Sequence, residues 1–382
     1  MEISQLDRIS YSILLQETLE LRQVLQSIVN SQDTIDNYDI FIPFLPIMSS
    51  VCLGWCDLFT KEGIKIEIPD IEGYSCVRLL KNCRIGLKLY CDQRIGKATK
   101  QLKKNSEETY RLLKTDYNIF QRLVVSMLGQ CDFGVFTINE LPYGNTSQLF
   151  LYISDVINFE RYKSLGVWET EARKVVFEFS KLLSQFINTI IDSFAKSIDS
   201  FAKSNMIDKD SQIELVRFNF SYNDYFLIDE KRRNILKGDL PIEIQLQLFN
   251  ILCQNNFIIN VLPLVFQSGG LLYHRSRLQT YLVSVNTIKK IINKFPNEKY
   301  QKQLKEIVEV KEIYFDKDSV LRNNIFHYKI EGVDDSIFSI PEKYFYEFIE
   351  FNSRVEFNDF MQVISEEIIK INKVIYKMVE FC

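Results

Sequence analysis

The C-terminal stretch from Phe357 to Phe381 constrains the fold of this chain most strongly. Its large apolar residues recur every three or four positions, as the residues on one face of a helix do: Phe360, Val363, Ile364, Ile368, Ile371, Ile375 and Val379. A helix with such a stripe is stable only when other elements cover it. The sequence therefore predicts a bundle of four to six helices over residues 241–382, in which this helix packs against the segment around Leu321 and Ile325.

Composition favours the same fold class for the whole chain. Only 13 Gly and 8 Pro occur in 382 residues, fewer than the many turns of an all-β protein require. The 29 Phe and 19 Tyr residues provide enough large apolar side chains to form a substantial core. We therefore expect a predominantly all-α chain with at most a few short strands.

Length and local composition predict two domains joined by a polar region. We expect a helical N-terminal domain at 1–204, a linker region at 205–240 and the helical bundle at 241–382. Apolar periodicity predicts helices at 4–30, 40–59, 107–128, 169–198, 242–252, 257–266, 271–295, 301–314 and 357–381. Alternating apolar residues predict a strand at 64–69 and a short strand pair within 129–142, followed by a turn at 142–145.

The eight cysteines do not form a metal-binding pattern. They include no CxxC pair and no nearby histidine, so we expect reduced thiols in the core rather than a metal site. No secretory signal segment is predicted, and the longest apolar region, Phe257 to Phe266, carries Asn260 and Pro263 and is too short to span a bilayer. These features predict a cytoplasmic protein that does not enter a membrane.

Charge is unevenly distributed along the chain. The formal net charge of -4 provides no general attraction for nucleic acid. The stretch from Lys81 to Lys104, however, contains eight basic residues and one acidic residue, a local net charge of +7 (eight minus one). This stretch is either a solvated surface or an RNA-binding surface. Its candidate RNA-binding residues are Lys88, Arg94, Lys97, Lys100, Lys103 and Lys104.

The segment from Leu321 to Lys329 carries the residues that we expect to be catalytic. On a helix, Asn323 and His327 are four positions apart and share a face, and Arg322 lies one step round the same side. Arginine supplies a permanent forked cation for phosphate, and histidine exchanges protons near neutral pH. The alternative is a half-buried histidine beside a surface arginine. Three residues of the opposite face are predicted to pack inward: Leu321, Ile325 and Tyr328.

The stretch Arg322-Asn323-Asn324-Ile325-Phe326-His327 resembles the R-x4-6-H motif of the HEPN superfamily, including the polar residue after the arginine. The resemblance implies a helical bundle with a metal-independent, cofactor-free endoribonuclease site, formed at the cleft of a homodimer. It also implies a toxin or abortive-infection, anti-phage role, with RNA as substrate and an antitoxin or a phage-derived trigger as partner. The N-terminal domain would then sense a trigger, contact RNA, or be a degenerate HEPN-like bundle.

Several features of the motif leave alternatives open. Some HEPN members are catalytically inactive interaction or scaffold proteins, and this chain is open to the same interpretation. Phe326 is predicted to project away from the packed face, where either a second copy or another part of the same chain would cover it. The second histidine lies in Tyr273-His274-Arg275-Ser276-Arg277, and we expect His274, Arg275 and Arg277 either to contact RNA or simply to be exposed.

Overall fold

A computed structural model describes most of the chain. The described residues are 5–30, 38–63, 68–71, 73–89, 100, 102–104, 106–108, 110–111, 117–153, 156–157, 165–193, 220–265, 270–296, 299–315, 319–328, 330, 333 and 343–381. The helices are α1 (Gln5–Asn30), α2 (Tyr38–Lys61), α3 (Cys76–Leu89), α5 (Ile119–Leu128), α6 (Thr146–Ile153), α7 (Leu165–Ser193), α9 (Ile242–Asn256), η3 (Phe257–Val261), α10 (Leu262–Val265), α11 (Leu271–Lys294), α12 (Gln301–Tyr314), α13 (Ser319–Phe326), α14 (Tyr344–Ser353) and α15 (Phe357–Val379). The strands are β1 (Phe133–Ile138), β2 (Leu141–Asn145) and β3 (Phe220–Tyr225).

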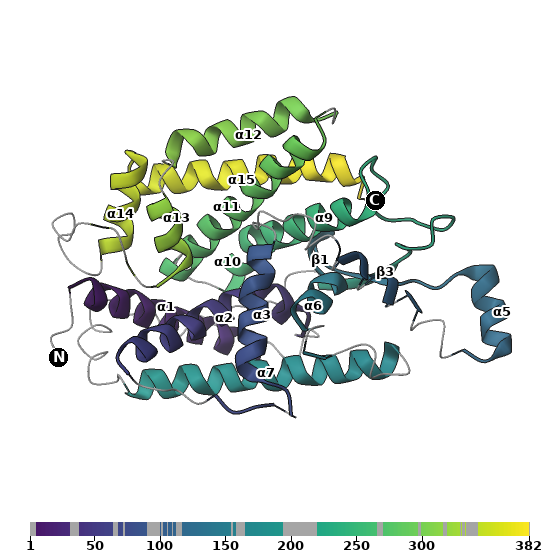
Figure 1. Ribbon diagram of the computed structural model, residues 1–382, viewed down its shortest axis with the longest axis horizontal. Helices are drawn as coiled ribbons and strands as arrows, with labels where there is room; N and C mark the ends of the chain where they lie inside the picture. Colours follow the sequence, from purple (N-terminus) through teal and green to yellow (C-terminus); the bar gives the residue numbers. More distant parts are fainter. Residues whose placement is uncertain are drawn as a thin grey trace.

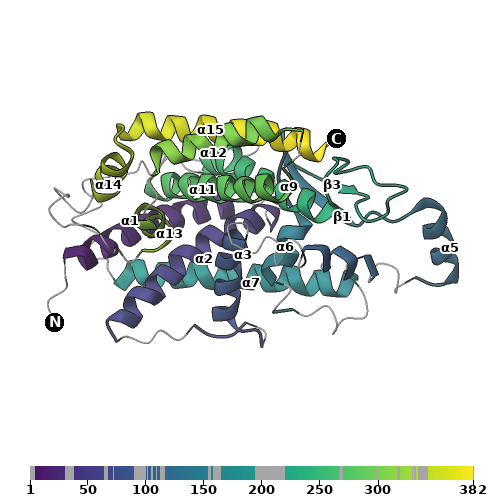
Figure 2. The same cartoon turned by 45° about the horizontal axis from the view of Figure 1, so that its top comes forward.

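Helices dominate the fold, which confirms the predicted class (Figure 1). Helices α12 and α15 lie along one side, α9 and α11 lie beneath them, and α7 lies on the opposite side beyond α1 and α2 (Figures 1 and 2). The apolar stripe of α15 is buried, apart from half-buried Val363, and packs mainly against α9 and α11. The predicted partner was wrong, because the motif helix α13 packs chiefly on α11 instead.

The apolar core is continuous across the predicted boundary at 205–240. Helix α1 packs against α11, and β2 packs against α9, so elements from both predicted domains contribute to one cluster of buried side chains. The predicted linker also contains β3, which pairs with β1. The division into domains at 1–204 and 241–382 stays a prediction, but the packing does not stop at the boundary.

A small antiparallel sheet in the order β2-β1-β3 adjoins α9. An antiparallel pair was predicted within 129–142; β1 lies inside that stretch, but β2 lies mostly beyond it. The connecting residues Asn139 and Glu140 have φ values of 46° and 69°, as a two-residue hairpin turn of type I′ requires. The turn predicted at 142–145 was wrong, because these residues belong to β2. Of the strand predicted at 64–69, residues 64–67 lie outside the described part of the chain, and Ile68 and Pro69 are not in a strand.

The predicted helix at 107–128 is interrupted in the structure. Tyr117 and Asn118 are not helical, and α5 begins afresh at Ile119. A capping box explains the new start: the Asn118 side chain accepts a hydrogen bond from the Gln121 backbone N–H (2.8 Å), and the Gln121 side chain accepts one from the Asn118 backbone N–H (3.0 Å). Apolar periodicity continues across such a break, so it did not indicate the interruption.

Among the residues that the structure describes, two helical segments are long and apolar enough to cross a membrane, namely Ile40–Lys61 and Ile242–Val265, so the expectation that 257–266 is the longest apolar stretch was wrong. In the fold, 83% and 78% of their most apolar windows are buried by the rest of the protein. Core helices pass the same test of length and hydropathy, so these segments are only weak support for a membrane span.

Glu20 of α1 is a buried carboxyl group that caps another helix. Its two oxygens accept hydrogen bonds from the backbone N–H groups of Leu271 (2.9 Å) and Leu272 (2.7 Å), at the first turn of α11. A Cβ atom at Gly270 would lie 2.4 Å from the carboxyl carbon of Glu20, so glycine allows this close approach. Burial raises the pKa of Glu20 from 4.5 to about 7.

We predict that Glu20 makes the protein less stable as pH rises. Because its pKa is raised in the folded state, the folded protein retains this proton longer than the unfolded chain, and the associated stability is lost between about pH 4.5 and pH 7. A shift of this size corresponds to about 3 kcal/mol. Urea unfolding at pH 5 and pH 8 should show a smaller loss of stability in Glu20→Gln than in the wild type. Glu309→Gln, an exposed change on α12, is the control, and equal pH dependence in wild type and Glu20→Gln would contradict the prediction.

Candidate functional site

The motif occupies α13 and the residues that directly follow it. The helix ends at Phe326, and the His327 backbone N–H still donates to the Asn323 carbonyl (2.9 Å), which continues the last turn. Asn323 and His327 are both exposed, in agreement with the predicted shared face. Leu321, Ile325 and Tyr328 are buried, which confirms that the opposite face packs inward. The side chain of Arg322 lies outside the described part of the structure, so its position beside His327 stays a prediction.

The basic residue that the structure places at His327 is Arg84 of α3. Its Nη2 atom lies 2.8 Å from His327 Nδ1 and donates to the Phe326 carbonyl at 3.2 Å. Its Nη1 atom lies 3.5 Å from a carboxylate oxygen of Asp57, which is largely exposed. Arg84 belongs to the basic stretch 81–104, but no local pattern indicates that it meets His327, because the two residues are 243 positions apart.

The contact with Arg84 determines the tautomer of the His327 ring. A guanidinium group has only donors, so Nδ1 accepts the hydrogen bond and the ring proton lies on Nε2. In this arrangement Nε2–H can donate to a phosphate oxygen, but neither ring nitrogen is open to take a proton. A role for His327 as a general base therefore requires Arg84 to leave Nδ1.

Beneath the motif, Arg275 is buried and was wrongly predicted to be exposed or to contact RNA. Its Nε atom donates to Glu17 (2.5 Å), and its Nη1 atom donates to the carbonyls of Asn324 (3.0 Å) and Ile325 (2.9 Å). Burial opposes the charge on Arg275, but the Glu17 carboxylate raises its pKa above the usual value. Arg275 therefore caps the last carbonyl groups of α13 from inside the core.

Tyr328 joins the same buried group on the other side of His327. Its hydroxyl donates to the second oxygen of Glu17 (2.5 Å), and the Arg275 guanidinium carbon lies 4.8 Å from its ring centre. Burial and the Glu17 carboxylate raise the pKa of Tyr328 well above its usual range, so it remains a donor. A Cβ atom at Gly54 would lie 2.4 Å from this ring, so α2 needs glycine there. The cluster Glu17–Arg275–Tyr328 thus holds the chain immediately before and after His327.

His274 and Arg277 are half-buried and engaged with α15 rather than forming an open basic surface. Arg277 Nη2 lies 2.6 Å from His274 Nδ1, and Nη1 donates to the Ser365 hydroxyl (2.7 Å). The His274 ring packs edge-on against Phe357, with ring centres 5.0 Å apart. Burial lowers the pKa of Arg277. The expectation that they are simply exposed was wrong, and an RNA contact through them stays a prediction.

Phe326 is buried, with 8% of its surface exposed, so it is covered by its own chain. Of the two alternatives, the intrachain one is therefore confirmed, and the residue does not offer a free anchor for a second copy. The reason is that α13 ends at this residue and its last turn lies against other elements of the fold, including Arg84 of α3.

The basic stretch is described only in part. Lys100, Lys103 and Lys104 are exposed, and Lys103 lies 4.0 Å from Glu107. The side chain of Lys88 and the residues Arg94 and Lys97 fall outside the described part of the structure. An RNA-binding role for this surface stays a prediction.

Of the six cysteines that the structure describes, four are buried in the core, and Cys56 and Cys131 are half-buried. Cys52, Cys76, Cys83 and Cys253 are buried, which confirms the prediction for these four. Burial raises the pKa of Cys76 to about 12, so its thiol stays protonated. Within the described ranges, no three His, Cys, Asp or Glu side chains come together in a group that could hold a metal ion. Cys91 and Cys382 are outside these ranges.

Comparison of the chain with models of protein families, with curated proteins and with solved structures gives no match. The resemblance to the HEPN superfamily therefore rests on residues 322–327 alone. Any functional assignment has to be argued from the residues gathered around His327.

Proposed function

We propose that this chain is a metal-independent endoribonuclease of the HEPN type, acting in the cytoplasm as a toxin or abortive-infection, anti-phage effector. The observation that supports this proposal best is the exposed His327 ring, with the Arg84 guanidinium 2.8 Å from its Nδ1 atom. A proton-exchanging ring beside a permanent cation suits attack on a phosphodiester. An antitoxin or a phage-derived trigger would control such an enzyme.

In the proposed reaction, the RNA phosphate draws the Arg84 guanidinium away from His327. A guanidinium binds a phosphate through charge-assisted hydrogen bonds, which are stronger than its bond to a neutral imidazole nitrogen. His327 Nδ1 is then open to take the proton of the 2′-hydroxyl, which attacks the adjacent phosphorus. Arg84 stabilises the charge that develops on the phosphate oxygens, together with Arg322 if its side chain reaches the site. Asn323, exposed on the same face, donates to a phosphate oxygen.

The leaving 5′-oxygen needs a proton from a second acid. The only other histidine in the sequence, His274, is engaged with Arg277. A second copy of the chain would supply a second His327, so the proposal includes a homodimer with two motifs at one cleft.

A scaffold or interaction protein is the second candidate, and helix α5 favours it. None of the ten residues of α5 is buried, and its exposed large apolar side chains are Ile119, Phe120, Leu123, Met127 and Leu128. Exposed apolar surface of this kind is typical of protein interaction sites. In that case the contact between Arg84 and His327 would be structural only.

The deciding experiment measures cleavage of single-stranded RNA by the purified protein in EDTA, over a range of protein concentrations, together with sedimentation. The proposal predicts cleavage in the chelator, with specific activity that rises as dimer forms. A protein that binds no RNA and cleaves none at any concentration would favour the scaffold function. Activity from a monomer would contradict the shared cleft.

We predict that the exposed lysines at 100, 103 and 104 contribute to RNA binding through phosphate contacts. Changing all three to Glu should weaken binding irrespective of base sequence and reduce the slope of log affinity against log salt by about 2, since each phosphate contact on a single strand contributes about 0.7. Filter binding at several salt concentrations measures this slope. A triple Glu variant at the exposed residues Lys302, Lys305 and Lys373 has the same change in charge and serves as control. Equal slopes in the two variants would identify the stretch as ordinary solvated surface.

A further inference from the structure

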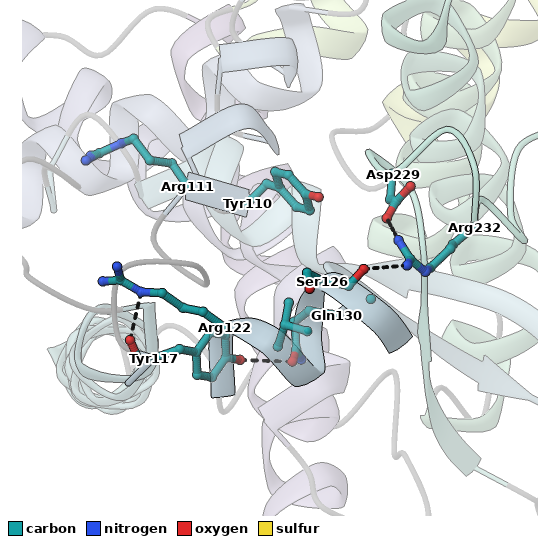
Figure 3. A pocket seen from close by; sticks show the side chains of 10 residues that line it. Tyr110, Arg111, Tyr117, Arg122, Ser126, Gln130, Asp229 and Arg232 are labelled. Carbon is teal, nitrogen blue, oxygen red and sulfur yellow. Dashed lines mark hydrogen bonds and ion pairs between the residues drawn. The ribbon is translucent and has the colours of Figure 1, made fainter. Parts of the chain in front are cut away.

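A pocket of about 630 Å³ lies where helix α5 meets the segment after β3 (Figure 3). Helix α5 stands out from the helical body, far from α13 (Figures 1 and 2). The volume is within the range of small-molecule sites, roughly 300–1,000 Å³. Its lining residues come from before, within and after α5, together with Asp229 and Arg232, and none of them belongs to the His327 site.

Arg232 forms one wall of the pocket, and its guanidinium is hydrogen-bonded to other residues of the protein. Its Nη2 atom donates to the carbonyls of Ser126 and Met127, both at 2.8 Å, and its Nη1 atom donates to Asp229 at 2.7 Å. These bonds satisfy the C-terminal carbonyls of α5 and attach the helix to the segment after β3. The hydrogen bond from Arg232 lowers the pKa of Asp229, which therefore stays ionised.

The other two arginines of the pocket differ in their partners. Arg111 is paired with the Glu108 carboxylate, with its Nη2 atom at 2.7 Å. Arg122 donates from Nε to the Tyr117 carbonyl (2.9 Å), which is a neutral acceptor. Among the described residues no carboxylate neutralises Arg122, so this side chain brings a positive charge that an anionic ligand can use.

Aromatic and amide groups line the same pocket as Arg122. In Figure 3, Tyr110 lies above Tyr117, and Ser126 and Gln130 lie to their right, toward Arg232. The Tyr117 hydroxyl donates to the Gln130 side-chain oxygen (2.9 Å), which fixes the orientation of the phenol. Tyrosine rings provide stacking surfaces for a nucleobase, and an amide can bond to its edge.

We propose that this pocket binds one nucleotide unit, with the phosphate on Arg122 and the base against the tyrosines. A guanidinium that no described carboxylate neutralises can bind the phosphate of a nucleotide, the two aromatic rings can stack on its base, and the amide can bond to the edge of the base. A free mononucleotide and one unit of a single RNA strand share this chemistry.

The test is a calorimetric titration of the full chain with the four 5′-mononucleotides, the matching nucleosides, inorganic phosphate and a short single-stranded RNA. We expect one nucleotide per chain, at least about tenfold weaker binding of the nucleoside and of phosphate alone, and at least about tenfold weaker nucleotide binding by Arg122→Gln. Arg78→Gln, an exposed change on α3, should bind as the wild type does. Tyr117→Leu should weaken nucleotides but not phosphate.

Binding by His327→Ala at wild-type affinity would separate this pocket from the proposed cleavage site, because the pocket needs no catalysis. Tight binding of free mononucleotides would identify a small-molecule site. Binding of the short RNA without binding of mononucleotides would identify a strand-binding site. Absence of both, or equal nucleotide affinity in Arg122→Gln and the wild type, would overturn the proposal. Nucleosides that bind as tightly as nucleotides would also overturn it.

Discussion

Replacing His327 with alanine is expected to reduce RNA cleavage at least about 100-fold, because a general base contributes about 10²–10⁴-fold to the rate. His327 is exposed and contributes little to the core, so the variant should keep the fold of the wild type. Single-turnover cleavage of a labelled RNA in EDTA, at saturating protein, measures the rate of the chemical step. Circular dichroism and thermal unfolding check the fold.

The matched control for this experiment is His274→Ala, which removes the other histidine. It should lose some stability, because His274 packs on Phe357 and contacts Arg277, but it should retain cleavage. Arg84→Gln removes the guanidinium from His327 Nδ1 but also removes the proposed phosphate-binding cation. We therefore expect this variant to cleave RNA more slowly than the wild type as well. Cleavage at the wild-type rate by purified His327→Ala would refute the proposed role of His327.

Replacing Arg275 with alanine is expected to lower the free energy of unfolding by about 3–5 kcal/mol, which is the usual effect of removing one partner of a buried ion pair. The change leaves the Glu17 carboxylate buried without its cation and leaves the carbonyls of Asn324 and Ile325 without the donor that Arg275 supplies. Urea unfolding at constant pH measures the effect. Because the same bonds hold the chain before His327, RNA cleavage should fall as well.

The control for Arg275 is Arg78→Ala, since Arg78 is exposed on α3 and its removal should change stability little. The double variant Glu17→Leu with Arg275→Met should be more stable than Arg275→Ala, because it leaves no buried charge unpaired. A loss below about 1 kcal/mol in Arg275→Ala would show that the cluster does not hold the two ends of the motif.

The sequence by itself determined the helices whose periodicity is strongest. Helix α12 begins and ends at the predicted residues, and α2, α11 and α15 agree with prediction to within about two residues at each end, because spacings of three and four residues are a local property of the chain. The same helical periodicity determined that Leu321, Ile325 and Tyr328 turn inward while Asn323 and His327 face solvent. The break before α5 was missed, since it depends on a cap at Asn118 rather than on periodicity.

Tertiary structure decided which charged groups are buried and which meet at the site. The residues next to Arg275 in the sequence do not indicate that it is buried. It is buried because α1 packs nearby and places Glu17 within ion-pair distance. In the same way, Arg84 reaches His327 because α3 lies against the end of α13, although 243 residues separate them. A local pattern specifies which face of a helix is apolar but not which distant face covers it. The burial of a charge depends on a partner that only the folded chain brings within hydrogen-bonding distance.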